Sequence, residues 1–209
     1  IDPRIAWVWP DDFDATETYR DVISAPVTGH VVADPGTTFF DGTDSPEVVF
    51  LAFDAETKEP AKLVVLNART QREVWKKLSV YDATLGKTFH FSAISTPAIG
   101  NLDADPQAEI CVVSLGYEYV PNVSTLVRSV ACLDGETGAL EWVSELDEQA
   151  YGAAITLADL DQDGQSEVIL GNRVLSGVDG TTLAQGADGD PMGGWGYAEQ
   201  SFNSTYDYA

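Results

Sequence analysis

Short runs of apolar residues recur along the chain, and each run is bounded by Gly, Asp, Asn or Pro. The runs at 47–53, 62–68, 109–115 and 167–171 are rich in Val, Ile and Leu. None is long enough, or has the 3.6-residue period, to predict a helix. Short apolar runs between turn-forming residues are typical of strands, so the pattern predicts an all-β chain.

Turn-forming pairs predict where these strands reverse direction. Gly171-Asn172 lies between two apolar runs and predicts a two-residue hairpin. Asp134-Gly135 and Asp179-Gly180 predict two further turns.

The chain contains three internal repeats, at 24–75, 95–142 and 151–186. Each repeat has a glutamate at the start of an apolar run. The three copies of this landmark are Glu47, Glu109 and Glu167, which stand 62 and 58 residues apart. A period of this size indicates a repeat architecture.

A tryptophan ends the first two repeats. Trp75 follows Asn67 by eight residues, and Trp142 follows Asp134 by eight residues. In the third repeat, counted from the predicted turn at 179–180, Ala187 stands at this spacing. The tryptophan position is therefore predicted to be lost in the third repeat.

Four strands in each repeat of about 40 to 60 residues predict blades of a β-propeller. We expect an all-β fold of four-stranded antiparallel blades, with about three blades here as part of a larger ring, since propellers close with about 4 to 8 blades. Closure by another copy of the chain is the alternative. The partial propeller, 1–209, divides into a strand of a preceding blade and a link (1–23), three blade units (24–78, 95–146 and 151–187), and a link with the start of a further blade (188–209).

The third repeat carries the clearest candidate metal site. Oxygen-bearing side chains stand at positions 1, 3, 5, 7 and 9 of one loop, namely Asp159, Asp161, Asp163, Gln165 and Glu167. Gly164 at position 6 allows the sharp turn that brings such ligands together. We expect carboxylates with the main-chain carbonyl of position 7 to hold Ca²⁺, which takes 6 to 8 oxygen ligands. An EF-hand is excluded because Leu170 stands where its last glutamate is needed.

The second repeat has the same spacing with two departures. Asn101 replaces the first carboxylate, and Pro106 replaces the glycine. One charge fewer predicts weaker affinity. The loop residues are Asn101, Asp103, Asp105, Gln107 and Glu109. The first repeat has only Asp41, Asp44 and Glu47 around an apparent insertion, and we predict no metal there. The chain is thus expected to bind about two Ca²⁺ ions.

The segments 95–113 and 155–180 resemble the FG-GAP/VCBS repeats of integrin α-subunit propellers and of large secreted bacterial proteins. The resemblance implies a seven-bladed propeller with calcium in the loop between the first two strands of certain blades. Position 9 is glutamate here where integrins usually have aspartate, and the FG and GAP tripeptides are absent. The ligands that it implies are Asp159, Asp161, Asp163 and Glu167, and less closely Asn101, Asp103, Asp105 and Glu109.

A second resemblance competes with the first. The stretch from Asp134 to Trp142 is similar to the tryptophan-docking motif of pyrroloquinoline-quinone dehydrogenases. The motif is intact once, altered around Asn67, and absent from the third repeat. An enzyme is therefore not expected, although the propeller of a larger secreted enzyme, such as a polysaccharide lyase or a quinoprotein dehydrogenase, is the alternative.

The net charge of the chain excludes some classes of binding partner. The 209 residues include 34 acidic and only 11 basic side chains, for a formal net charge of -23. Such a field repels nucleic acid and anionic membrane surfaces, and no apolar run is long enough to span a bilayer. The chain opens on Ile1 with no leader pattern, which is typical of a processed piece whose export signal has been removed.

The cysteines and four aromatic residues are the remaining candidates for a structural or binding role. Cys111 and Cys132 fall on the second and third strands of one predicted blade, where they either form a disulfide or remain free buried thiols. Aromatic residues on Gly-containing segments opposite the calcium loops are candidates for a ligand surface: Tyr117, Tyr119, Trp195 and Tyr197.

We predict a non-catalytic, calcium-binding module that is secreted or on the cell surface. Its partners would be a protein or carbohydrate outside the cell, or other chains of the same assembly.

Overall fold

A computed structural model describes residues 9, 17–34, 44–54, 56, 60–103, 105–120, 123–146 and 154–186. At 116–120 and 123–127 only the backbone is described. In these ranges every regular element is a strand, and all strands within the sheets pair antiparallel. The prediction of an all-β chain is confirmed. The described part contains no helix with the length and apolar character needed to cross a membrane.

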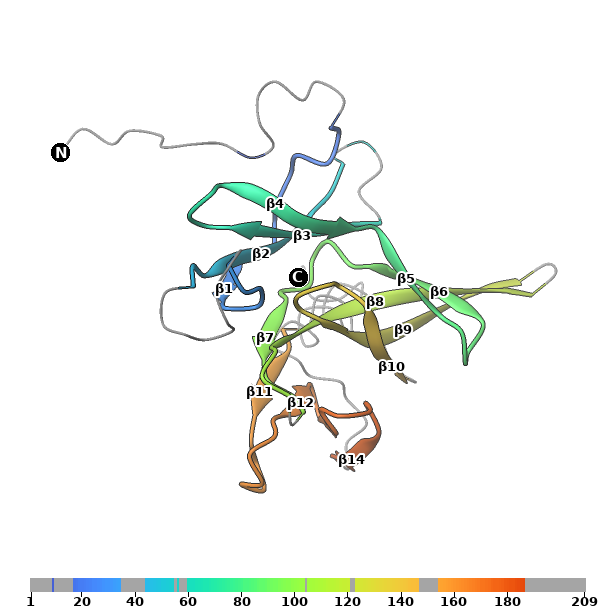
Figure 1. Cartoon of the computed structure of the whole chain (residues 1–209). Coiled ribbons are helices and arrows are strands. Elements are labelled where there is room, and N and C mark those ends of the chain that lie inside the picture. The colour runs from blue at the N-terminus through green and yellow to red at the C-terminus, as the bar shows by residue number, and fades with distance from the viewer. Residues whose placement is uncertain are drawn as a thin grey trace, which may run out of the picture.

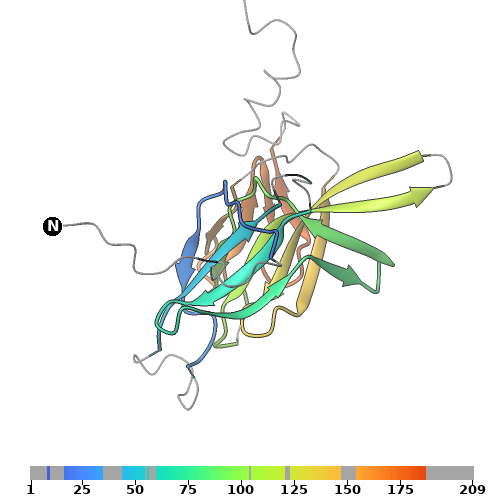
Figure 2. The same ribbon diagram turned by 90° about the horizontal axis from the view of Figure 1, so that it is seen from above.

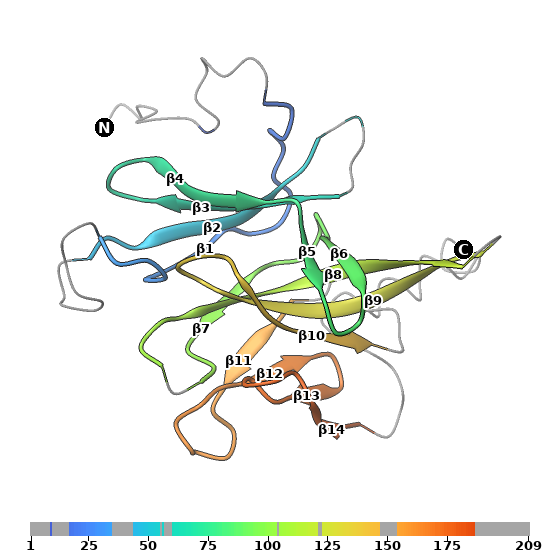
Figure 3. The same cartoon turned by 45° about the vertical axis from the view of Figure 1, so that its right-hand side comes forward.

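The strands form three sheets that follow one another along the chain (Figures 1 and 3). The first sheet consists of β1 (Val27–Gly29), β2 (Glu47–Ala52), β3 (Lys62–Asn67) and β4 (Arg72–Lys77), in that order. The third sheet has the same sequential order, with β11 (Thr156–Ala158), β12 (Glu167–Leu170), β13 (Arg173–Leu175) and β14 (Thr182–Gln185). Each is a meander in which neighbours in sequence are neighbours in the sheet.

The second sheet contains the same meander and one addition. Its four sequential strands are β7 (Ala98–Gly100), β8 (Glu109–Val120), β9 (Val123–Asp134) and β10 (Leu140–Leu146). A hairpin of β5 (Ser79–Asp82) and β6 (Lys87–Phe91) pairs with β8 from Phe89↔Gly116 to Phe91↔Ser114. The stretch between the first two predicted blade units, 79–94, therefore contains two strands of a sheet, whereas we expected only a link between blades there.

The second sheet curls so that its two ends approach each other. β5 lies near β10, and Lys87 Nζ on β6 forms a 2.7 Å ion pair with Glu145 Oε1 on β10. Phe89, Phe91 and Val80 fill the inside of the curl. The sheet is thus a half-barrel and not a flat ribbon.

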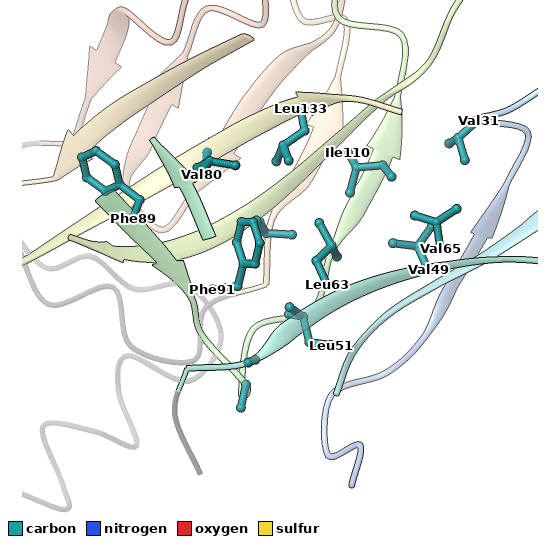
Figure 4. Close-up of a cluster of buried hydrophobic side chains, with 14 of the residues drawn as sticks. Val31, Val49, Leu51, Leu63, Val65, Val80, Phe89, Phe91, Ile110 and Leu133 are labelled. Atoms are coloured by element: carbon teal, nitrogen blue, oxygen red, sulfur yellow. The ribbon is translucent and has the colours of Figure 1, made fainter. Parts of the chain in front are cut away.

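Two hydrophobic clusters lie between successive sheets. The first joins the first and second sheets and includes Leu51, Leu63 and Ile110, all with no solvent exposure (Figure 4). The second joins the second and third sheets and includes Val113 and Val168. Alternate residues of β8 enter the two clusters, which explains why its first half is apolar at almost every position: both of its faces are buried.

The third and fourth strands of each sheet are joined by the same kind of turn. The amide of Gly180 donates to the carbonyl of Ser176 at 3.0 Å, as the amide of Gly138 donates to Asp134 at 2.7 Å. Both glycines have positive φ, near 70° and 66°. The turn of the third sheet therefore begins at Ser176 and ends at Gly180, so the predicted turn at Asp179-Gly180 is confirmed, and Ser176 is the counterpart of Asp134.

This turn changes which residue replaces the tryptophan. Trp142 pairs with Cys132 beside a β-bulge, and Ala184 pairs with Val174 beside the equivalent bulge. The counterpart of the tryptophan is thus Ala184. The expectation of Ala187 was wrong because it was counted from Asp179, inside the turn, and not from Ser176, where the turn begins.

A segment before the first sheet covers the outer face of that sheet. Trp9 meets Phe50 edge to face with ring centroids 4.8 Å apart, and Tyr19 packs on the same cluster. Glu17 forms ion pairs with Lys62 at 2.8 Å and Lys76 at 3.2 Å. These contacts tie residues 17–21 to the first sheet.

Candidate metal-binding loops

The three landmark glutamates have one structural role in common. Each begins the second strand of its sheet and is buried. Each accepts a hydrogen bond from the amide of the second residue beyond the first strand: Val31 to Glu47 at 3.0 Å, Leu102 to Glu109 at 2.6 Å, and Leu160 to Glu167 at 2.7 Å. The glutamate therefore closes the loop between strands one and two with one oxygen, and its other oxygen is available for a further partner.

In the third sheet, the loop gathers carboxylates around that second oxygen. Asp159, Asp161 and Glu167 each place one oxygen within 4.8 Å of the others. Gly164 adopts a φ of 94°, in the left-handed region that favours glycine, and Gln162 has a φ of 65°. The two positive φ values allow the chain to fold back so that positions 1, 3 and 9 meet.

Asp163 and Gln165 form hydrogen bonds with other residues of the same loop. The amide of Asp163 donates to Asp159 Oδ1 at 3.1 Å and to Asp161 Oδ1 at 3.2 Å. Asp163 Oδ1 accepts from the amide of Gln165 at 2.8 Å. Asp163 therefore holds the loop in shape, and its carboxylate is not one of the three that converge.

The equivalent loop of the second sheet is more deeply buried. Asp103, Asp105 and Glu109 also place one oxygen each within 4.8 Å of the others. Glu109 has no solvent exposure, and its Oε1 has no hydrogen-bond partner among the described residues. A buried carboxylate oxygen without a partner is costly, so this atom indicates a missing positive or hydrogen-bonding group.

The electrostatic environment of Glu109 agrees with its burial. Removal from water raises its pKa to about 8, the amide of Leu102 opposes this, and the negative charges of Glu141, Asp103 and Asp105 add to the rise. The pKa of Glu141 on β10 is itself raised to about 7 by burial and by neighbouring aspartates. Glu141 adds acidic charge near this loop, and the sequence analysis did not identify it because it lies outside the repeated spacing.

Asn101 and Gln107 complete the second loop. The side-chain amide of Asn101 donates to the carbonyl oxygens of Asp105 and Gln107, the latter at 3.1 Å. The side chain at position 1 of the loop therefore lies beside the main-chain carbonyl of position 7. Two of the groups that the ligand spacing predicts around the cation are thus close together. The side-chain oxygen of Gln107 is buried and, like that of Glu109, has no partner among the described residues.

The first sheet replaces this acidic cluster with a neutral donor. The amide nitrogen of Asn67 donates to Glu47 Oε1 at 3.1 Å and to Asp34 Oδ1 at 3.0 Å. Asp44 accepts from the amide of Asp34 at 3.0 Å, and Asp41 lies outside the described residues. Asn67 thus lies between two carboxylates at the place where the second sheet has an unpartnered oxygen. The sequence analysis did not identify Asp34, which lies before the apparent insertion.

The candidate ligand surface is divided between described and other residues. Tyr117 and Tyr119 lie on the outer half of β8, in a strand and not in a loop as the sequence analysis expected. Trp195 and Tyr197 lie outside the described residues. A ligand surface formed by these four residues therefore stays a prediction.

Cys111 and Cys132 form a disulfide between β8 and β9. The two residues are direct partners in the strand register, with Cα atoms 4.1 Å apart. Both are fully buried in the cluster between the second and third sheets. The bond therefore joins the base of the longest hairpin in the described part of the chain, at the third of its twelve residue pairs counted from Glu109↔Asp134.

No sequence-family profile matches the chain, and no curated protein sequence matches it. Among solved structures, the crystal structure of the V. cholerae biofilm matrix protein Bap1 is similar over 87% of this chain, with 16% sequence identity and a TM-score of 0.43. The chain spans 33% of the length of that protein. A similarity at this level decides neither the fold nor the function.

Proposed function

We propose that this chain is a non-catalytic, calcium-binding module of a secreted or cell-surface protein, serving adhesion, recognition or assembly. The observation that carries the proposal is the pair of equivalent loops, at 101–109 and 159–167, each of which gathers three carboxylate oxygens within 4.8 Å. The unpartnered Oε1 of Glu109 supports a bound cation in the first of them.

Calcium is favoured over other cations by the chemistry of the donors. Both loops offer carboxylates, amide oxygens and main-chain carbonyls, and no histidine or cysteine belongs to either cluster. Such oxygen-only sets suit hard cations, and an irregular loop suits Ca²⁺ better than Mg²⁺, which demands near-octahedral geometry. Bound calcium would compensate the charge of several neighbouring carboxylates and join the first two strands of its sheet.

We further propose that the three sheets are successive blades of a propeller. Each contains a meander of four sequential strands. Trp75 of the first sheet donates to the carbonyl of Gly135 in the second, and Trp142 of the second donates to Gly177 in the third. The same contact thus joins each sheet to the next, as expected when equivalent blades stack around an axis.

The disulfide supports the proposed location. Disulfides persist in oxidising surroundings such as the cell exterior and are rare in the cytosol. Cys111 and Cys132 are the only cysteines of the chain. A high negative charge also suits a protein that remains dispersed outside the cell.

Calcium titration by calorimetry tests the proposal directly. We expect two sites in the wild-type chain, and one in a variant with Asp159→Asn and Asp161→Asn together. Thermal melting in calcium should exceed melting in chelator, since a ligand bound only by the folded state stabilises it. Asp82→Asn, in a turn away from both loops, is the matched control. Absence of calcium binding at either loop would refute the metal-binding part of the proposal.

A further inference from the structure

β8 and β9 form a hairpin that extends well beyond the sheets on either side (Figure 2). Both strands have 12 residues, compared with six in each of β2 and β3. Their pairing is continuous from Glu109↔Asp134 to Val120↔Val123. We call the outer part, 117–120 of β8 and 123–127 of β9, the arm.

Both outer edges of the arm lack a partner strand in the described part of the chain. β6 pairs with β8 only as far as Gly116, and β10 pairs with β9 only as far as Arg128. Beyond these residues the arm is a two-stranded ribbon. Such a ribbon is marginally stable by itself in water, and its unpaired main-chain groups are a template for another strand.

The edge of β9 has none of the usual protection against pairing. Residues 123–127 read Val-Ser-Thr-Leu-Val, without a charge, a proline or a glycine. Edge strands that must remain unpaired usually carry lysine, another charge or proline. By contrast, the edge strand β4 carries Arg72, Glu73, Lys76 and Lys77.

The sequence of this edge is self-complementary. When two copies run antiparallel about Thr125, Val123 of each copy lies opposite Val127 of the other, and Thr125 lies opposite itself. A twofold axis perpendicular to the sheet generates this arrangement, and such isologous contacts are the commonest in homodimers. The two arms would then make one four-stranded sheet with no charged residue on either central strand of the arm.

We propose that the arm is an assembly surface on which a second copy of this chain docks by antiparallel pairing of the two β9 edges at 123–127. The geometry also limits the repulsion between two bodies of net charge -23. Five strand residues extend about 16 Å, so overlapping arms keep the bodies about 16 Å apart, roughly two Debye lengths at physiological salt. The pairing should therefore strengthen as salt is added. The inference does not depend on calcium.

Sedimentation velocity over a concentration series, in the presence of calcium, measures the pairing. The wild type should form a dimer whose dissociation constant falls at higher salt. Thr125→Glu places like charges opposite each other at the axis and should raise the dissociation constant about fivefold or more. Thr125→Val, which is uncharged and β-branched, should leave it unchanged. Melting temperature and near-ultraviolet circular dichroism confirm that both variants are folded.

Cross-linking tests which edge is used. Thr125→Cys should form an intermolecular disulfide across the axis, because directly opposite residues have Cβ atoms about 4.5 to 5.5 Å apart. Glu118→Cys, on the other strand of the arm, should not. A wild type that stays monomeric at all concentrations and salts would overturn the proposal. A dimer that Thr125→Glu leaves intact, or that Glu118→Cys cross-links as well, would overturn the β9 edge as the contact.

Discussion

The indole nitrogen of Trp75 donates a 2.9 Å hydrogen bond to the carbonyl oxygen of Gly135, a residue 60 positions further along the chain. Trp142 makes the same bond, of 2.6 Å, to Gly177 in the next sheet. Each ring also lies against the glycine that ends the neighbouring turn, Gly138 or Gly180. A side chain at the end of one repeat is thereby joined to the main chain of the next.

Gly180→Ala tests this contact between sheets. Gly180 has a φ of 70°, and an added Cβ would lie 2.3 Å from Cε3 of Trp142. Gly86 has a φ of 65° and open space around it, so Gly86→Ala measures backbone strain alone, about 1 kcal/mol. Gly180→Ala should cost about 1 to 3 kcal/mol more through overpacking. Equal losses of unfolding free energy in denaturant titrations would contradict the close packing of Trp142 on the turn.

Asn101→Asp should raise the calcium affinity of the second loop. The change supplies the carboxylate that Asp159 provides in the third loop, and it removes the amide donor that holds Asp105 and Gln107 without metal. We therefore expect tighter binding in calorimetry together with a lower melting temperature in chelator. Asp159→Asn is the reverse change in the third loop and should weaken binding there. Unchanged affinity in both variants would exclude position 1 as a ligand.

Asn67→Asp should destabilise the first sheet. The amide of Asn67 bridges the buried Glu47 and the half-buried Asp34, and the substitution would replace that donor with a third carboxylate at a buried position. A loss of about 3 kcal/mol in unfolding free energy is expected from the unpaired charged groups. Asn101→Asp, the same chemical change at an exposed residue, should cost less, and equal losses in the two variants would contradict the role of burial at Asn67. If calcium restores the stability of Asn67→Asp, the neutral donor occupies the place of a cation.

Glu17 should make a pH-dependent contribution to stability. Burial acts to raise the pKa of Glu17. Hydrogen bonds from Lys62, Lys76 and the amide of Tyr19, together with the positive charge of Lys62, outweigh burial and lower this pKa below its ordinary value of 4.5. The stabilisation is therefore present above pH 4.5 and is lost as pH falls through the lowered value. Melting temperatures of the wild type and Glu17→Gln should differ at neutral pH and converge as pH falls below 4.5 through the lowered pKa. A constant difference would contradict the role of the ionised carboxylate.

The disulfide between Cys111 and Cys132 should resist reduction until the hairpin opens, because both residues are fully buried. Mass spectrometry after a mild reductant should show no change in native protein, and a gain of two hydrogens once denaturant is added. Replacing both cysteines with alanine should cost about 3 kcal/mol, since the bond closes a loop of 21 residues in the unfolded chain. Rapid reduction of the native protein would show that β8 and β9 separate readily.

The strands, the repeats and the chemistry of the two acidic loops could be read from the sequence because each depends on neighbours. The apolar runs at 47–53 and 109–115, the Gly171-Asn172 turn and the landmark glutamates all use local periodicity and turn chemistry. For the same reason, the spacing at 159–167 indicated where Asp159, Asp161 and Glu167 would converge.

What remained was decided by contacts between residues far apart in the chain. The pairing of β6 with β8 turned an expected link into part of a half-barrel, and no local pattern in 79–91 specifies that partner. Asn67 and Asp34 meet across 33 residues, and the burial that leaves Glu109 Oε1 without a partner in the described part of the chain comes from the packing of whole sheets. The predicted Asp179-Gly180 pair lies in the turn of the third sheet, but the first residue of that turn, Ser176, is set by the strand register, which depends on packing of both faces.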